Sequence, residues 1–219
     1  MSSPLIIDYY SDVLCVWAWI AQRRITEIEE QWGDKIQLRH RYMNLFGDTS
    51  TRMQQQWAER GGYEGFGQHV LESAAPYDKA PVADAIWQHV RPSTSANAHL
   101  VVKAASLAFG EAQSAVLATE LRKAFFVDTV NIGELPEVLK IAGKIDIDPA
   151  CLRTLLENGE AMAALMSDYK LALDNNVKGS PTWIMNNGRQ VLYGNVGYRI
   201  LHANIEEILN HPEQEASWC

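Results

Sequence analysis

The stretch that decides the fold is residues 5–18, which read LIIDYYSDVLCVWA. Its first half, from Leu5 to Tyr10, is apolar and aromatic and predicts a strand, whereas the pattern from Cys15 onward is helical. Cys15 therefore stands where a strand ends and a helix begins. Free amide groups and the positive end of the helix dipole favour a thiolate there, so we expect a lowered pKa and a nucleophilic role for Cys15. The alternative is a buried structural cysteine.

The two ends of the chain predict the two halves of one α/β fold. A strand, a helix and a second strand at the N-terminus form a βαβ unit. Near the C-terminus, Asn186-Asn187-Gly188 separates two short strands, which is typical of a β-hairpin, and a helix follows. A βαβ half joined to a ββα half is the layout of a thioredoxin fold. Besides the first strand, the expected elements are a helix over 16–32, strands over 35–42, 182–185 and 190–193, and a helix over 200–209.

The middle of the chain predicts an inserted all-helical domain. The run from Gly61 to Gly67 contains four glycines and predicts a flexible loop before the helices. Farther on, Asp148-Pro149 supplies a cap and a first-turn proline. The last helix of this part places on one face Met162, Leu165, Met166, Tyr169 and Leu173. The predicted domains are residues 1–50 with 175–212 (thioredoxin-like) and 51–174 (helical insertion), followed by a tail over 213–219.

Composition narrows the classes of function. The 219 residues carry a net charge of −8 and no basic face for phosphates, so we expect no nucleic-acid binding. No apolar run approaches the roughly 20 residues of a membrane span, and the N-terminus lacks a basic leader, so we expect a cytoplasmic protein without a membrane partner. The three cysteines, Cys15, Cys151 and Cys219, are an odd number at remote positions, which argues against a disulfide framework. The six histidines lack zinc-site spacing, so no metal is expected.

Several motifs resemble the DsbA-like thioredoxin superfamily over nearly the whole chain. They are residues 12–19 (DVLCVWAW), 95–100 (SANAHL), 124–126 with 131–133, and 179–182 (GSPT). The likeness points to the cytoplasmic branch that includes dithiol oxidoreductases with a Cys-Pro-Trp-Cys site, 2-hydroxychromene-2-carboxylate isomerases and kappa-class glutathione transferases. It implies an α/β thioredoxin fold with an inserted all-helical domain.

The resemblance also implies roles for single residues. Cys15 would be the attacking sulfur, and Pro181 a cis proline facing it. The backbone of Ser180 would then pair with an extended peptide or with glutathione. The residues expected to bind substrate are Trp17, Ala18, Asn44, Ser180, Thr182 and Asn195. Asn195 has the alternative of capping the last helix, and Asn44 that of stabilising the turn before Gly47.

Two positions depart from the dithiol members of the family. Val16 replaces the proline after the nucleophile, and Ala18 replaces the resolving cysteine. Without that cysteine a mixed disulfide at Cys15 has no internal route of release, unless Cys151 or Cys219 reaches the site.

Three functions follow from this monothiol Cys-Val-Trp-Ala site. The leading hypothesis is a thiol oxidoreductase that acts through Cys15 alone, with glutathione or another small thiol as cosubstrate and no permanently bound cofactor. The alternative is a glutathione-dependent isomerase or transferase, in which Cys15 would hydrogen-bond the thiolate of glutathione. The third is a non-catalytic peptide-binding module. The helical insertion offers a surface for a homodimer.

Overall fold

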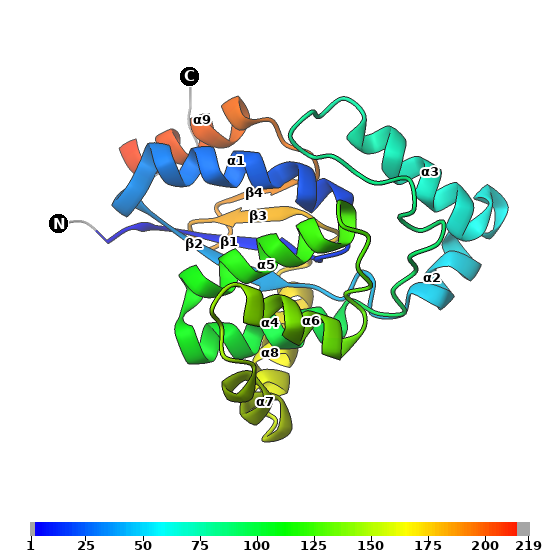
Figure 1. Ribbon diagram of the computed structural model, residues 1–219. Helices are drawn as coiled ribbons and strands as arrows, with labels where there is room; N and C mark the ends of the chain where they lie inside the picture. Colours follow the sequence, from blue (N-terminus) through cyan, green and yellow to red (C-terminus); the bar gives the residue numbers. More distant parts are fainter. Residues whose placement is uncertain (1–2, 214–219) are drawn as a thin grey trace.

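A four-stranded mixed sheet lies at the centre of the computed structural model, which describes residues 3–213 (Figure 1). Its strands are β1 (Leu5–Ser11), β2 (Ile36–Tyr42), β3 (Thr182–Met185) and β4 (Gln190–Tyr193), in the order β2-β1-β3-β4. Strand β1 runs parallel to β2 and antiparallel to β3, and β3 pairs antiparallel with β4. The turn between β3 and β4 places Asn186, Asn187 and Gly188 at positive φ, which asparagine and glycine adopt most readily. The predicted βαβ unit and hairpin are confirmed.

Helices surround the sheet, and seven of the described helices lie between β2 and β3 in the sequence. The first helix of the chain ends at Trp32, and Gly33 caps it: its N–H donates to the Glu29 carbonyl, and its φ of 48° turns the following chain away from the helix. The seventh begins as predicted, with the Asp148 carboxylate accepting the Ala150 N–H at 2.9 Å. The described helices are α1 (Val16–Trp32), α2 (Thr49–Gln56), α3 (Gly62–Ala74), α4 (Ala96–Phe109), α5 (Glu111–Phe126), α6 (Leu135–Lys144), α7 (Pro149–Glu157), α8 (Glu160–Asp174) and α9 (Tyr198–Asn210).

Different helices cover the two faces of the sheet. Helices α1 and α9 lie side by side over one face, where Ile7 and Trp183 are buried with Ile205 of α9 (Figure 1). The opposite face carries Tyr10, which packs in one cluster with Ala172 of α8. The alternation of Ile7 and Tyr10 between the faces follows the two-residue period of a β-strand.

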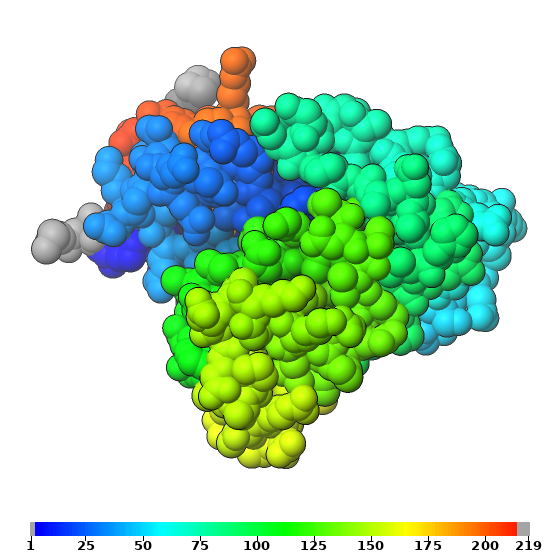
Figure 2. All heavy atoms as spheres, viewed as in Figure 1, coloured from blue at the N-terminus to red at the C-terminus, as the bar shows by residue number. Residues whose placement is uncertain are grey.

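A larger core lies between the helices of the insertion and reaches the start of α1. Val13, Leu14 and Val16 are buried in the same cluster as Trp87 and Phe125. In the space-filling view, a dark-blue part of the N-terminal segment emerges between the teal segment and the green helices (Figure 2). The turn before α1 therefore lies where the thioredoxin half and the helical insertion meet.

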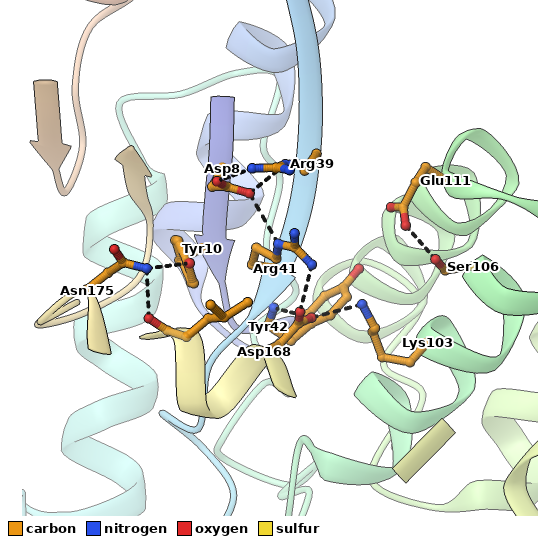
Figure 3. A network of polar contacts seen from close by, with 11 residues as sticks. Asp8, Tyr10, Arg39, Arg41, Tyr42, Lys103, Ser106, Glu111, Asp168 and Asn175 are labelled. Atoms are coloured by element: carbon orange, nitrogen blue, oxygen red, sulfur yellow. Dashed lines mark hydrogen bonds and ion pairs between the residues drawn. The ribbon is translucent and has the colours of Figure 1, made fainter. Parts of the chain in front are cut away.

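A polar network also joins the insertion to the sheet (Figure 3). Asp168 of α8 is 1% exposed and pairs with Lys103 of α4 at 3.0 Å and with Arg41 of β2 at 3.1 Å. It also accepts the backbone N–H of Tyr42 at 3.2 Å. Arg41 makes a second ion pair, with Asp8 of β1, at 3.2 Å. One buried carboxylate thus ties α8, α4 and β2 together.

The prediction of a flexible loop from Gly61 to Gly67 is wrong. Nearly all of this segment belongs to helix α3, because Phe66 and Val70 supply a face that is buried in the helical core. Its glycines permit close packing: a Cβ on Gly65 would collide with the Arg60 carbonyl oxygen. Tertiary packing therefore outweighs the low helix propensity of glycine.

The apolar face predicted for α8 differs from its buried face. Leu165 is buried and Tyr169 half-buried, but Met162, Met166 and Leu173 are exposed. The buried residues of α8 are Ala161, Leu165, Asp168 and Ala172. Because Asp168 is one of these buried residues, the face of α8 that packs against the protein differs from the face that carries its large apolar side chains.

In the sequence, the helical part of the chain lies between strands β2 and β3. Its first helix, α2, begins at Thr49, slightly before the predicted boundary at residue 51, and its last, α8, ends at Asp174. The division into two separate domains stays a prediction. Residues 214–219 of the predicted tail lie outside the described residues. None of the described helices is long and apolar enough to cross a membrane.

Candidate functional site

Cys15 is the residue that precedes helix α1 and acts as its N-cap. Its backbone N–H donates to the Asp12 carbonyl at 3.1 Å, which closes the turn between β1 and α1. Its side chain is almost fully buried, and the thiol donates to the carbonyl oxygen of Ser180 at 3.2 Å. The peptide bond between Ser180 and Pro181 is cis. The sequence motifs around Cys15 and Ser180 thus meet at one place.

Asp12 fixes the position of both segments. Its backbone N–H donates to Ser180 Oγ at 3.0 Å, while its own carboxylate is fully buried. The donors that hold this carboxylate are the N–H groups of Leu14, Leu45 and Phe46 and the hydroxyl of Ser95. They come from the β1–α1 turn, the segment after β2 and the start of α4. These hydrogen bonds offset the cost of burying the carboxylate.

His99 supports the same turn from within the helical core. Its Nε2 accepts the N–H of Val13 at 3.2 Å, so we assign the ring proton to Nδ1, which lies 3.2 Å from the Tyr169 hydroxyl. Burial lowers the pKa of His99, so the ring is neutral at pH 7. Both ring nitrogens therefore have partners within the fold.

The expected lowering of the Cys15 pKa is wrong. Burial raises the pKa of the thiol, because the thiolate would lose its hydration. Hydrogen bonds with the Ser180 side chain and with the amides of Ala18 and Trp17 act in the opposite direction and lower it. The helix N-terminus does stabilise the thiolate, but burial outweighs it. The protonated thiol therefore predominates at neutral pH.

A pocket of about 460 Å³ opens over Cys15. Its walls come from the start of α1, the segment after β2, helices α2 and α3, the residues before β3 and the end of β4. The lining residues are Cys15, Val16, Trp17, Leu45, Phe46, Arg52, Gln56, Trp57, Phe66, His69, Lys178, Gly179, Ser180 and Tyr193. The wall combines apolar and aromatic side chains with polar and charged ones, so it can bind both the apolar and the polar parts of a small molecule.

Three of the predicted site residues line this pocket: Cys15, Trp17 and Ser180. Pro181 follows Ser180 directly and is buried. Asn195 lies elsewhere: it accepts from Arg24 at 2.6 Å and donates to the Tyr77 hydroxyl at 2.6 Å. The residue that caps α9 is Gly197, so Asn195 does not cap that helix, and its role in substrate binding stays a prediction.

The other predicted residues support the site from outside the pocket. Ala18 and Thr182 are buried, and the Thr182 hydroxyl donates to the Gly179 carbonyl at 2.6 Å. Asn44 is exposed and lies over Gly47, where a Cβ would collide with its Oδ1. The structure therefore favours the alternative for Asn44, a role in the turn.

Sequence reasoning gave no binding role to the other residues of the pocket wall, among them Arg52, Trp57, His69, Lys178 and Tyr193. Arg52 belongs to α2, Trp57 follows that helix directly, and His69 belongs to α3. A lone arginine, histidine or lysine forms no motif, so the sequence alone offers no signal for them.

Of the other two thiols, Cys151 does not line the pocket. Cys151 is half-buried near the start of α7 and is a free thiol. Cys219 lies outside the described residues. Across residues 3–213, no three His, Cys, Asp or Glu side chains gather in a group that could hold a metal ion.

Several solved structures share this fold. A cytosolic disulfide reductase, DsbM, from Pseudomonas aeruginosa superposes with a TM-score of 0.71 at 19% identity, covering 92% of this chain and 99% of that one. The structure of the same protein with GSH gives a TM-score of 0.68 at 17% identity, covering 92% and 100%. A 2-hydroxychromene-2-carboxylate isomerase superposes with a TM-score of 0.67 at 15% identity, covering 97% and 100%. No curated protein matches the sequence.

The family comparison spans almost the whole fold. The model of the DSBA-like thioredoxin domain matches residues 6–206, from strand β1 into helix α9. The matched region contains the turn with Cys15, the helical insertion and the Ser180–Pro181 segment. The chain therefore belongs to the DSBA-like thioredoxin domain family.

Proposed function

We propose that the protein catalyses thiol–disulfide exchange through Cys15 alone, with glutathione or a similar small thiol as its partner. The observation that carries the proposal is the position of the Cys15 sulfur, 3.2 Å from the Ser180 carbonyl in the wall of the pocket. An extended thiol substrate can pair with the backbone of Ser180 while its sulfur approaches Cys15.

The exchange takes two balanced steps. The Cys15 thiol loses its proton to water, and the thiolate attacks one sulfur of a disulfide R–S–S–R. The substrate S–S bond breaks, a bond forms between Cys15 and the R–S group, and RS⁻ leaves and is protonated. A thiolate R′S⁻ from a second molecule then attacks the R–S sulfur, which releases the Cys15 thiolate and forms R–S–S–R′. This step needs an external thiol, because Ala18 stands where a resolving cysteine would.

The comparisons support this choice of partner and compartment. The DsbM structure with GSH shows that small thiol together with a protein of the same fold. DsbM is described as a cytosolic disulfide reductase, which supports a cytoplasmic setting for this chain.

The test is to trap the first intermediate. Reduced protein treated with glutathione disulfide should gain one glutathionyl group at Cys15, located by mass spectrometry of its peptides. The Cys15→Ser variant should gain none in that peptide, and Cys151→Ser should react like the wild type. A wild type that is modified only at Cys151 or Cys219 would contradict the proposal.

One observation favours a second function, glutathione-dependent isomerisation or transfer. Burial keeps Cys15 protonated, and its S–H already acts as a hydrogen-bond donor, to Ser180. A protonated thiol in this position could donate to the thiolate of bound glutathione instead of attacking it. That function predicts tight non-covalent binding of reduced glutathione that survives in Cys15→Ser, without a mixed disulfide. If glutathione neither forms an adduct with Cys15 nor binds non-covalently, the peptide-binding module is the function that remains.

A further inference from the structure

The pocket over Cys15 differs in charge from the rest of the molecule. The protein as a whole carries a net charge of −8. Yet the described residues that line the pocket include two cations, Arg52 and Lys178, and no aspartate or glutamate. A third basic residue, His69, is neutral at pH 7, because burial lowers its pKa. The wall that faces a substrate is thus positive on an acidic protein.

Arg52 lies in this wall against an aromatic ring. Its guanidinium carbon lies 4.9 Å from the centre of the Phe46 ring, which fixes the side chain beside the pocket. Its Nε is buried and, within residues 3–213, has no hydrogen-bond partner. Burial lowers the pKa of Arg52, while a thiolate at Cys15 and the carboxylate of Asp12 act against that effect. An arginine remains protonated throughout the physiological range, so Arg52 brings a positive charge to the pocket wall.

Lys178 brings the second charge from a segment far away in the sequence. It is exposed and immediately precedes Gly179 and Ser180, and the carbonyl of Ser180 accepts the hydrogen bond of the Cys15 thiol. Tyr193 lies directly against Gly179, where a Cβ would stand 2.8 Å from its hydroxyl oxygen. The absence of a side chain at Gly179 thus lets an aromatic ring close this wall beside the lysine.

We propose that Arg52 and Lys178 select thiol and disulfide partners that carry a carboxylate close to the reacting sulfur, with Arg52 as the main determinant of specificity. The guanidinium can bind a carboxylate with two parallel hydrogen bonds, which a lysine cannot do. The inference rests on the proposed thiol exchange and adds the chemical class of its substrate. The new bond between Cys15 and the R–S group would form while the carboxylate of R pairs with Arg52.

The test compares three small disulfides that have the same two-carbon spacer and different end groups. They are 3,3′-dithiodipropionate, with carboxylates, bis(2-hydroxyethyl) disulfide, without charge, and cystamine, with ammonium groups. The measured quantity is the rate of adduct formation at Cys15, divided by the rate of the same reagent with the urea-unfolded protein. This ratio removes the intrinsic reactivity of each reagent.

The expected order of these ratios is carboxylate, then neutral, then ammonium. A charge-assisted hydrogen bond predicts a preference for the carboxylate over the neutral reagent of roughly tenfold to a hundredfold. Arg52→Gln should remove most of that preference and Lys178→Gln a part of it. Rising salt should weaken it in the wild type.

The matched control is Arg60→Gln. Arg60 also lies over an aromatic ring, 5.3 Å from the centre of Trp57, but it is exposed and does not line the pocket. Its loss changes the net charge as much as that of Arg52 and should leave the preference intact. Equal ratios for the three reagents, or equal effects of the two arginine variants, would overturn the selectivity and leave thiol exchange standing. A wild type that reacts with none of the reagents would overturn the exchange itself.

Discussion

Replacement of Asp168 by alanine should destabilise the protein more than any surface substitution. The change leaves the Lys103 ammonium, whose side chain is 8% exposed, without a counter-charge, and the Tyr42 N–H without its acceptor. Arg41 keeps its second partner, Asp8. Removing one partner of a buried ion pair costs about 3–5 kcal/mol. That is a large share of the roughly 5–15 kcal/mol by which domains are stable.

Urea unfolding and thermal melting measure this cost. At about 2–4 °C per kcal/mol for a chain of this size, the melting temperature should fall by roughly 6–20 °C. The control is Asp174→Ala, which removes an exposed pair with Lys170 on the same helix and should cost less than about 1 kcal/mol. The double variant Asp168→Leu with Lys103→Met should be more stable than Asp168→Ala, because it removes both charges of the buried pair and leaves no unpaired ammonium at position 103.

The outcome that would refute this reasoning is a similar loss for Asp168→Ala and Asp174→Ala. The network of Figure 3 would then contribute little, and the attachment of α8 and α4 to the sheet would rest on apolar packing alone.

Three further predictions concern titration and redox chemistry. Because burial raises the Cys15 pKa, its alkylation rate should still increase above about pH 8.5, the ordinary thiol value; a plateau below that pH, with Cys15→Ser as the blank, would contradict this. Burial lowers the pKa of His40 to about 3, so the stability that its neutral form provides should be lost as the pH falls from 6.5 toward 3. The free energy of unfolding of His40→Phe should vary less with pH in this window than that of the wild type. The same pH dependence in both proteins would contradict this role of His40. Ala18→Cys should form an internal disulfide with Cys15 and reduce insulin faster than the wild type without glutathione; no gain would favour the isomerase or the binding module.

The parts of the fold that the sequence predicts are those set by local pattern. The first strand, helix α1 and the hairpin at Asn187 each carry their own signal in a few consecutive residues. Helix α3 escapes such a prediction, because propensity alone counts its glycines against a helix. The face that stabilises α3, with Phe66 and Val70, is buried against residues far away in the sequence, which only the folded structure brings near. The burial of Asp168 has no local signal either, since its cations come from two other elements.

The site shows the same division between local and distant causes. The position of Cys15 at the start of a helix follows from the order of residues around it. The direction of its pKa does not, because burial arises from segments such as Phe46 and Ser180 that are far away in the sequence. Arg52 and Lys178 become neighbours of the thiol only when α2 and the segment before β3 meet at the pocket.

The measurement that tests the central claim most directly is the release of glutathione from the Cys15 mixed disulfide. The purified adduct is mixed with increasing concentrations of reduced glutathione, and the return of the free thiol is followed by mass spectrometry. Exchange through one thiol predicts a rate proportional to the concentration of added glutathione, with almost no release in its absence, in both the wild type and Cys151→Ser. Release at a constant rate without added thiol would contradict the account, because it would mean that a second cysteine of the chain resolves the intermediate.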